Sequence, residues 1–268
     1  MTGAQQGPSF AWRDAFAELQ GRKVLVTGGS TGIGAAVARA FGSCGAHVAV
    51  HYHASRDPAA AVAEDIARSG GQGVIVGADL SSDTAAGNLV RAAEGMLGGL
   101  DLLINNAGSI LGRTPTLELR PEDYRKILDL NLTAAFHACQ AAIPGFRQRG
   151  GGAIINTTSL AARMGGGPGT VAYAAAKAGI STMTRGLAKE FAPDGIRVNA
   201  VAPGFIRTPL HDRYTAPAIL DDFEKSVPLG RLGEPEDCVG AYLFLACGSL
   251  SGYVTGQTIE VNGGILMP

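Results

Sequence analysis

The amino-acid sequence predicts an α/β fold, a single doubly wound domain in which helices cover both faces of a parallel sheet. Three observations support it. Short apolar runs alternate with helical patterns from Lys23 onward, these runs have no polar face, and a glycine-rich turn joins the first run to the first helix. No linker divides the 268 residues. We therefore expect one dinucleotide-binding catalytic domain over residues 21–268, after an N-terminal extension of residues 1–20.

The first half of the chain alternates four apolar strands with three helices. Gly45 is the stop signal of the first helix, and Pro58 stands near the start of the second. Strands are expected at residues 23–28, 46–52, 73–77 and 100–106, and helices at 33–44, 58–69 and 83–97.

The second half repeats this alternation up to a closing strand. Helices are expected at residues 121–148, 172–192 and 235–245, and strands at 153–158, 197–201 and 258–261. Residues 209–227 fit neither pattern. Because this segment follows a strand end and carries aromatic and charged residues, we interpret it as a substrate lid.

Composition limits the partners and the compartment. The net charge is −1, without a basic block, which argues against nucleic acid and membrane partners. Four cysteines lack Cys-x-x-Cys spacing, which favours buried thiols in a reducing, cytoplasmic setting. No apolar run reaches the ~18 residues of a membrane span. The histidines lack acidic or cysteine partners at ligand spacing, so no metal site is expected.

The glycine-rich turn indicates a dinucleotide site. Glycines allow close approach to a pyrophosphate, and the helix that follows offers free amides and partial positive charge. The spacing Gly-x-x-x-Gly-x-Gly is one residue looser than the common fingerprint. The expected contacts are Thr27, Gly28, Ser30, Thr31, Gly32, Ile33 and Gly34.

The end of the second strand predicts the choice of cofactor. An acid there would bind both ribose hydroxyls of NAD, but this chain has no acid before Asp57. Arg56, with Ser55 and a histidine, could hold a 2′-phosphate. NADP(H) is therefore favoured and NAD(H) remains possible, the alternative being an ordinary polar loop. The residues concerned are Tyr52, His53, Ser55 and Arg56.

Two further strand ends face the same crevice of such a sheet. Asp79 and Leu80 follow the third strand, where the adenine ring would lie. Asn106, Ala107 and Gly108 end the fourth strand.

Tyr173 and Lys177 are four residues apart on an expected helix and therefore share a face. A free phenol titrates near ~10. A neighbouring cation favours the phenolate, so we expect Lys177 to lower the pKa of Tyr173 toward the range that acid–base catalysis needs. Ser159, at a strand end, can stabilise oxyanion charge on a substrate carbonyl.

These motifs, in this order, resemble the short-chain dehydrogenase/reductase family over residues 21–264. The resemblance implies a Rossmann-type sheet of seven parallel strands, a nicotinamide cofactor and the tetrad Asn131, Ser159, Tyr173 and Lys177. It implies that Asn131 interrupts the bonding of a long helix and orients a water, and that Lys177 holds ribose hydroxyls. Over the nicotinamide it places Pro203, Gly204, Ile206 and Thr208.

Two departures from the family pattern stand out. Ser159 and Tyr173 are 14 residues apart, where many relatives have 13, and the glycine-rich loop between them can absorb the extra residue. Reductases acting on 3-oxoacyl groups of acyl carrier protein usually grip the acidic carrier with an arginine where this chain has His137. Lys189 keeps a basic group at the other usual contact.

The expected function is interconversion of a ketone and a secondary alcohol by hydride transfer, with Tyr173 as general acid/base and a small carbonyl or alcohol as substrate. The alternatives are a 3-oxoacyl-[acyl-carrier-protein] reductase and, in another class, a catalytically silent NADP-binding redox sensor. A sugar-nucleotide epimerase usually has a longer chain. The edge strand at residues 258–261 and the alanine-rich helices favour a homotetramer.

Overall fold

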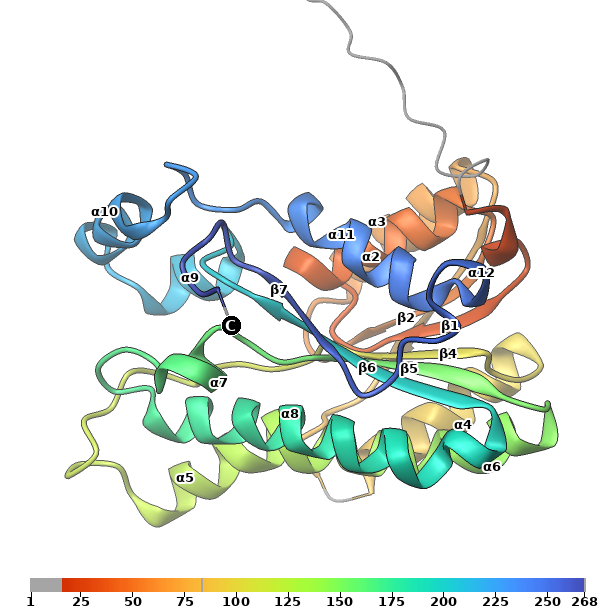
Figure 1. Ribbon diagram of the computed structural model, residues 1–268, viewed down its shortest axis with the longest axis horizontal. Helices are drawn as coiled ribbons and strands as arrows, with labels where there is room; N and C mark the ends of the chain where they lie inside the picture. The colour runs from red at the N-terminus through yellow and green to blue at the C-terminus, as the bar shows by residue number, and fades with distance from the viewer. Residues whose placement is uncertain (1–15, 83, 268) are drawn as a thin grey trace, which may run out of the picture.

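The computed structural model describes residues 16–82 and 84–267. Its centre is one seven-stranded sheet, all parallel, in the order β3-β2-β1-β4-β5-β6-β7 (Figure 1). The order reverses between β1 and β4, which opens a crevice at the carboxyl ends of these strands. The expected doubly wound α/β fold is confirmed. The strands are β1 Lys23–Val26, β2 His47–Tyr52, β3 Gln72–Gly77, β4 Leu102–Asn105, β5 Gly152–Thr157, β6 Ile196–Pro203 and β7 Thr258–Val261.

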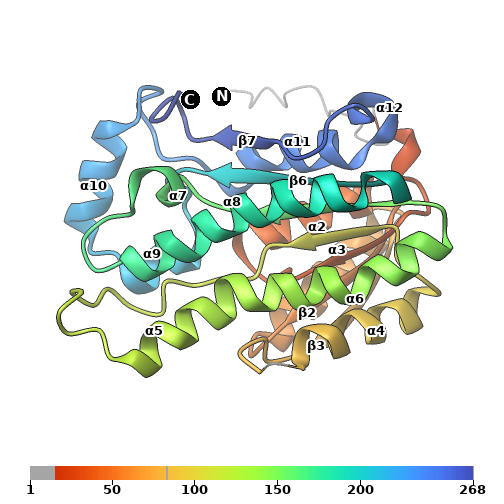
Figure 2. The same ribbon diagram turned by 60° about the horizontal axis from the view of Figure 1, so that its bottom comes forward.

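Helices connect successive strands and cover both faces of the sheet (Figures 1 and 2). The main helices are α2 Gly32–Ser43, α3 Arg56–Arg68, α4 Ala85–Leu97, α5 Pro121–Leu128, α6 Ala134–Gln148, α8 Val171–Phe191 and α11 Pro235–Ala246. The remaining ones are η1 Ala17–Leu19, η2 Asp129–Thr133, α7 Ala161–Met164, η3 Ala192–Asp194, α9 Pro209–Tyr214, α10 Pro217–Ser226 and α12 Gly248–Ser251.

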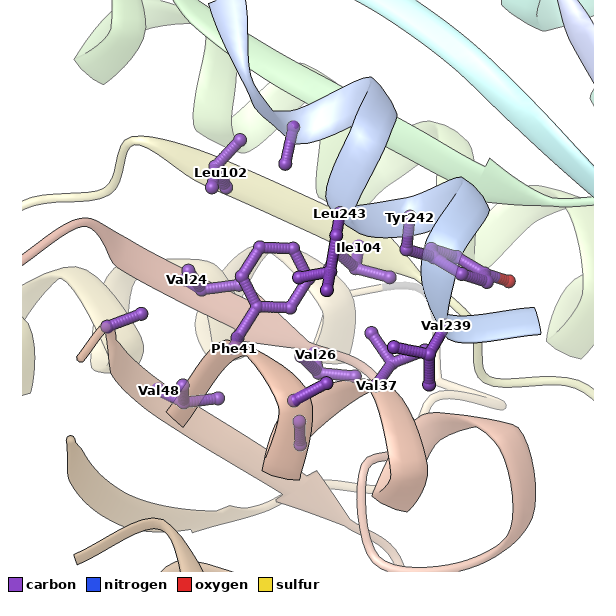
Figure 3. Packing of buried hydrophobic residues seen from close by; sticks show 14 of the residues in the cluster. Val24, Val26, Val37, Phe41, Val48, Leu102, Ile104, Val239, Tyr242 and Leu243 are labelled. Carbon is purple, nitrogen blue, oxygen red and sulfur yellow. The ribbon is translucent and has the colours of Figure 1, made fainter. Parts of the chain in front are cut away.

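Alternate residues of a strand enter separate cores because successive side chains point to opposite faces. Val24 and Val26 of β1 lie in a core with α2, α3 and α11, where Phe41 packs under Leu243 (Figure 3). Leu25 lies in the other core, with α4, α6 and α8. The five inner strands are mostly buried on both faces, as the pattern predicted, whereas the edge strands β3 and β7 are largely only partly buried.

Three local features differ from the expected elements. The expected helix at residues 121–148 is interrupted by the π-helical turn η2. The lid folds into α9 and α10. Leu19, within the expected extension, is buried, and Glu18 accepts hydrogen bonds from the amides of Gly248 and Ser249, so residues 16–20 belong to the packed structure. Residues 1–15 of that extension lie outside the described residues.

Within the described ranges, no helix is both long enough and apolar enough to cross a membrane.

Candidate active site

The turn after β1 is held by Thr27 and Asn106, which come from neighbouring strands. The buried Thr27 hydroxyl accepts the amides of Asn106 at 2.9 Å and Ala107 at 3.0 Å. The Asn106 side chain donates to the carbonyls of Thr27 at 3.0 Å and Gly28 at 3.1 Å. These bonds fix the ends of β1 and β4 against each other, so both predicted motifs lie at the crevice.

The glycines of the turn are required by close backbone contacts. A Cβ on Gly34 would lie 2.1 Å from the Gly28 carbonyl oxygen, and Gly28 itself has φ +61. Gly32 also has a positive φ, +53, and a Cβ there would meet Thr208 at 3.2 Å. The first amides of α2 have no intrahelical partners and face the crevice mouth. Thr208, predicted to contact the nicotinamide end, therefore lies against the glycine-rich turn.

The end of β2 presents a polar surface. Ser55 precedes α3 and Arg56 opens it, with the Arg56 side chain exposed. The His53 imidazole lies 3.8 Å from the Asp79 carboxylate, both exposed. The Tyr52 ring packs against Gly77 of the neighbouring strand, because a Cβ on that glycine would meet the ring at 3.0 Å. The Leu80 side chain, by contrast, points into the core with α4, which leaves only its backbone for adenine.

His51 is a residue that the sequence analysis did not assign to the site. Its ring is buried, and Nδ1 accepts the Gly28 amide at 2.9 Å while Nε2 lies 3.1 Å from the Ala78 carbonyl oxygen. Burial is the largest influence and lowers the pKa of His51. The hydrogen bond to Ala78 raises this pKa by a smaller amount, and the charge of His53 lowers it slightly further. The signal in the sequence was a titratable residue inside an otherwise apolar strand.

Asn131 lies in the π-helical turn η2. Such a turn forms where one extra residue is inserted into an α-helix. Its side-chain amide donates to the Ile127 carbonyl at 2.9 Å and to the Ser109 carbonyl at 2.7 Å, and its oxygen accepts the Ser109 amide at 3.0 Å. Asn131 therefore interrupts the helix as expected and ties it to the loop after β4. A Cβ on Gly108 would lie 2.6 Å from the Asn131 oxygen and 3.1 Å from Lys177 Nζ.

Tyr173 lies in the first turns of α8 and reaches Ser159, which follows β5. The phenol is half-buried. Burial raises the pKa of Tyr173, and a hydrogen bond with the Ser159 side chain lowers it in part. The structure therefore joins the predicted hydroxyl pair across a strand end and a helix.

Lys177 is buried one turn further along α8. Its ammonium donates to the Thr157 carbonyl at 2.9 Å and lies 5.8 Å from the centroid of the Tyr173 ring. Burial lowers the pKa of Lys177 to about 8, so the group is charged at pH 7. The expectation that Lys177 lowers the Tyr173 pKa is wrong for this structure, where the phenol pKa is raised. The reason is that the ammonium points to a strand carbonyl, while the ring loses water on burial.

The register between β5 and α8 is set by Thr158. Its hydroxyl donates to the Lys177 carbonyl at 2.7 Å and contacts the Ser181 hydroxyl at 2.8 Å. A short loop with Gly165, Gly166 and Gly169 at positive φ spans the remaining distance to α8. This loop and α7 make up the segment between Ser159 and Tyr173, where the sequence has one residue more than many relatives.

The motif after β6 lies under the lid. Pro203 ends β6, and Ile206 forms an isolated bridge with Gly233. A Cβ on Gly204 would lie 2.7 Å from the Asn262 backbone. A cavity of about 190 Å³ separates this motif from the lid, lined by Phe205, Ile206, Arg207, Thr208, Pro209, Leu220 and Leu232.

Two contacts attach α10 of the lid to this motif. The rings of Phe205 and Phe223 stack with centroids 3.8 Å apart and an interplanar angle of 3°. Arg207 forms ion pairs with Glu224 of α10 and Glu234 before α11, each at 3.4 Å. The lid therefore lies directly over the predicted nicotinamide contacts.

Arg113, which no sequence motif indicated, joins three loops at the site entrance. Its guanidinium donates to the Tyr214 carbonyl at 3.0 Å and the Thr215 hydroxyl at 3.2 Å, between α9 and α10. It also reaches the Pro168 carbonyl at 3.4 Å in the glycine-rich loop. The loop after β4 is thus bonded to both the lid and the loop before α8.

The residues present fit a nicotinamide dinucleotide. The turn after β1 has glycines at positions where a Cβ would collide with neighbouring atoms, so its backbone can approach a pyrophosphate closely. The tetrad lies at the other end of the same crevice. In the described part of the chain, no cluster of three or more possible metal ligands occurs. A sheet of this order with a Ser–Tyr pair at its crevice defines a nicotinamide-dependent oxidoreductase.

Comparisons with known proteins identify the family. A family model described as enoyl-(acyl carrier protein) reductase matches residues 28–266. A 3-oxoacyl-[acyl-carrier-protein] reductase of Synechocystis is 40% identical, with 93% of this chain and 98% of the relative covered. A 3β-hydroxysteroid dehydrogenase of Eggerthella lenta is 38% identical, with 94% and 96% covered. The crystal structure of an NADH-dependent reductase complexed with NAD matches with TM-score 0.84 and 36% identity, covering 94% and 100%.

The chain belongs to the short-chain dehydrogenase/reductase family. It is an oxidoreductase of the kind that interconverts ketones and secondary alcohols with a nicotinamide cofactor.

Proposed function

We propose that the chain reduces a ketone to a secondary alcohol, and reverses that reaction, with Tyr173 as the proton carrier. The observation that carries the proposal is the bond between Tyr173 and Ser159, with the Lys177 ammonium 5.8 Å from the phenol ring. When bound, the nicotinamide supplies or accepts the hydride. The substrate oxygen would lie between the two hydroxyls, where a proton can be delivered and oxyanion charge stabilised.

Each tetrad residue has a separate task in this proposal. Ser159 donates to the substrate oxygen, and Tyr173 gives it a proton in reduction or removes one in oxidation. Lys177 binds the ribose hydroxyls and keeps a positive charge 5.8 Å from the centroid of the Tyr173 ring. Asn131 holds the loop after β4 beside Lys177 and orients a water for the proton relay.

We further propose a preference for NADP(H) over NAD(H). In support, Arg56 is exposed at the start of α3, and the carboxylate that lies 3.8 Å from His53 is that of Asp79, which follows the next strand, β3. A guanidinium makes strong charge-assisted bonds to phosphate. The NAD complex of a 36% identical reductase belongs to that protein and leaves NAD(H) as the alternative cofactor here.

A substrate screen tests this function. The purified protein is mixed with NADPH or NADH and a panel of ketones that includes oxosteroids, keto-sugars and 3-oxoacyl thioesters, and absorbance at the reduced nicotinamide band is followed. We expect turnover of at least one ketone, faster with NADPH. If the protein bound NADPH and NADH but oxidised neither of them in the presence of any ketone, it would instead belong to the class of redox-sensing proteins.

A 3-oxoacyl-[acyl-carrier-protein] reductase is the second candidate. A 40% identical relative bears that name, and Lys189 is exposed near the end of α8. His137 stands where an arginine would support carrier binding. Comparing 3-oxoacyl groups on carrier protein and on coenzyme A distinguishes the two: a large preference for the carrier favours this candidate, and Lys189→Glu should then remove the preference.

We propose that residues 21–268 work as one catalytic domain, with residues 209–227 as the substrate lid and a homotetramer as the working assembly. Large apolar side chains support assembly: Tyr124 on α5, Phe136 on α6 and Val171 on α8 are 42%, 43% and 55% exposed. The four cysteines are free thiols, which supports a reducing, cytoplasmic compartment.

A further inference from the structure

We propose that His51 is the positioning residue that holds the Gly28 amide of the cofactor turn, and that it does so only as the neutral tautomer with its proton on Nε2. The inference rests on the proposed function, because it takes this turn as the pyrophosphate site.

The His51 ring bonds to the backbone of two segments that flank its own strand. It is 2% exposed, its Nδ1 lies 2.9 Å from the Gly28 nitrogen, and its Nε2 lies 3.1 Å from the Ala78 oxygen. The His51 carbonyl also accepts the Gly29 amide at 2.9 Å. One residue thus connects β2 to the turn after β1 and to the end of β3.

The two partners fix the tautomer. The Gly28 amide can only donate, so Nδ1 must be an acceptor without a proton. The Ala78 carbonyl can only accept, so Nε2 must carry the proton. A second proton on Nδ1 would face the Gly28 amide hydrogen and break that bond.

The turn at Gly28 is held in place by bonds from both neighbouring strands. Gly28 has φ +61, and a Cβ there would lie 3.0 Å from the Ala107 Cα. The Asn106 side chain holds the Gly28 carbonyl at 3.1 Å, and His51 holds its amide. The peptide groups on both sides of Gly28 are therefore oriented by neighbouring strands, which sets where the following amides point.

His53 is the charged group that acts on the His51 ring, and its charge lowers the pKa of His51. The turn from Gly28 to Thr31 has no titratable residue. On β2, His53 acts on the ring by charge, and Asp79, after β3, lies 3.8 Å from His53. Burial lowers the pKa of His51, so the ring is neutral at pH 7. The bond to Gly28 is then fully present above the pKa of a histidine in the unfolded chain, which is ~6.5. It is lost as pH falls toward the lower pKa that His51 has in the folded protein.

Two substitutions separate the two bonds. Asparagine places an amide oxygen where Nδ1 stands, so His51→Asn keeps an acceptor for Gly28. Glutamine extends to the Nε2 position, so His51→Gln keeps a donor for Ala78. His47→Asn, at the start of the same strand, is the matched control. The measurements are dissociation constants for NADH and NADPH by fluorescence titration, thermal unfolding without nucleotide, and amide exchange of Gly28.

We expect His51→Asn to bind nucleotide within about threefold of wild type and His51→Gln to bind about three- to tenfold more weakly than His51→Asn. Gly28 exchange should stay slow in His51→Asn and become faster in His51→Gln. If the ring served only to join β2 to β3 through Ala78, the order would reverse. A reversed order, or equal affinities of the two variants, would overturn the proposal.

The pH dependence gives a second readout. NADH lacks the titrating 2′-phosphate, and His53 is common to wild type and His51→Asn. Below pH 7, wild-type affinity for NADH should fall more steeply than that of His51→Asn; parallel curves down to the pH at which His51 gains its second proton would contradict the tautomer requirement. Gly28 exchange is measured without nucleotide, so it tests the bond between His51 and Gly28 by itself. If the wild-type chain bound no nucleotide, the proposed function would fail, but this exchange measurement would still test the role of His51.

Discussion

At the scale of single residues, the buried Lys177 shows how function and stability oppose each other. A charged group without a facing carboxylate is desolvated on folding, and its pKa of about 8 lies below the ordinary 10.5. Because the folded pKa is lower, folding bears this cost below pH 8, and the cost disappears as pH rises from 8 to 10.5. In return for this cost in stability, the folded protein has a cation beside the Tyr173 phenol and the predicted ribose site.

Lys177→Met should therefore raise the stability of the nucleotide-free protein at pH 7, by about 1–3 kcal/mol, while it removes activity. The gain should shrink by about 1 kcal/mol between pH 8 and pH 9. Denaturant unfolding at these pH values checks this, with Lys189→Met, an exposed lysine of the same helix, as control. If Lys177→Met were as stable as wild type or less stable at pH 7, burial of the charged Lys177 would not destabilise the folded protein.

Arg56 is the residue on which the cofactor preference depends. Arg56→Ala should weaken NADPH binding by about 1.5–3 kcal/mol, because a charged hydrogen bond to phosphate is lost, and should leave NADH nearly unchanged. Calorimetric titration with both nucleotides measures this, and Arg68→Ala at the other end of α3 is the control. Equal losses for both nucleotides, or a wild type that prefers NADH, would support the ordinary polar loop.

At the scale of elements, the sequence indicated the strands and helices because their apolar periodicity is local. The family resemblance also implied an interrupted helix at Asn131, and the π-helical turn there is its physical form. The lid helices and the contacts of Arg113 and His51 were not predicted. Those bonds join residues distant in the chain through backbone carbonyls and amides, and such partners leave no trace in side-chain patterns.

Arg113 should control how firmly the lid is held. Arg113→Ala removes the bonds to Tyr214, Thr215 and Pro168, so trypsin should cleave after Arg213 or Lys225 at least about threefold faster. Cleavage rates by mass spectrometry, with Arg185→Ala on α8 as control, measure this effect. Unchanged cleavage would mean that the stack of Phe205 on Phe223 and the ion pair between Arg207 and Glu224 hold the lid without Arg113.

At the scale of the whole molecule, edge strands and exposed apolar side chains point to assembly. Strand β7 pairs with β6 and lies at one edge of the sheet, and such an edge invites pairing unless it is covered. We expect light scattering at micromolar concentration to give a mass four times the 27.3 kDa of one chain. A mass near 27.3 kDa would contradict the tetramer. Phe136→Glu on α6 should lower the mass if that helix lies at an interface.

The central claim is that Tyr173 carries the proton in ketone reduction, and one variant tests it most directly. Tyr173→Phe removes only the hydroxyl, so we predict that kcat falls by ~10²–10⁴-fold while nucleotide affinity stays near wild type. Tyr253→Phe, fully exposed, should leave both unchanged. Steady-state kinetics with the best ketone, together with nucleotide titration, gives both quantities. A Tyr173→Phe enzyme that keeps more than about a tenth of wild-type kcat would contradict the account.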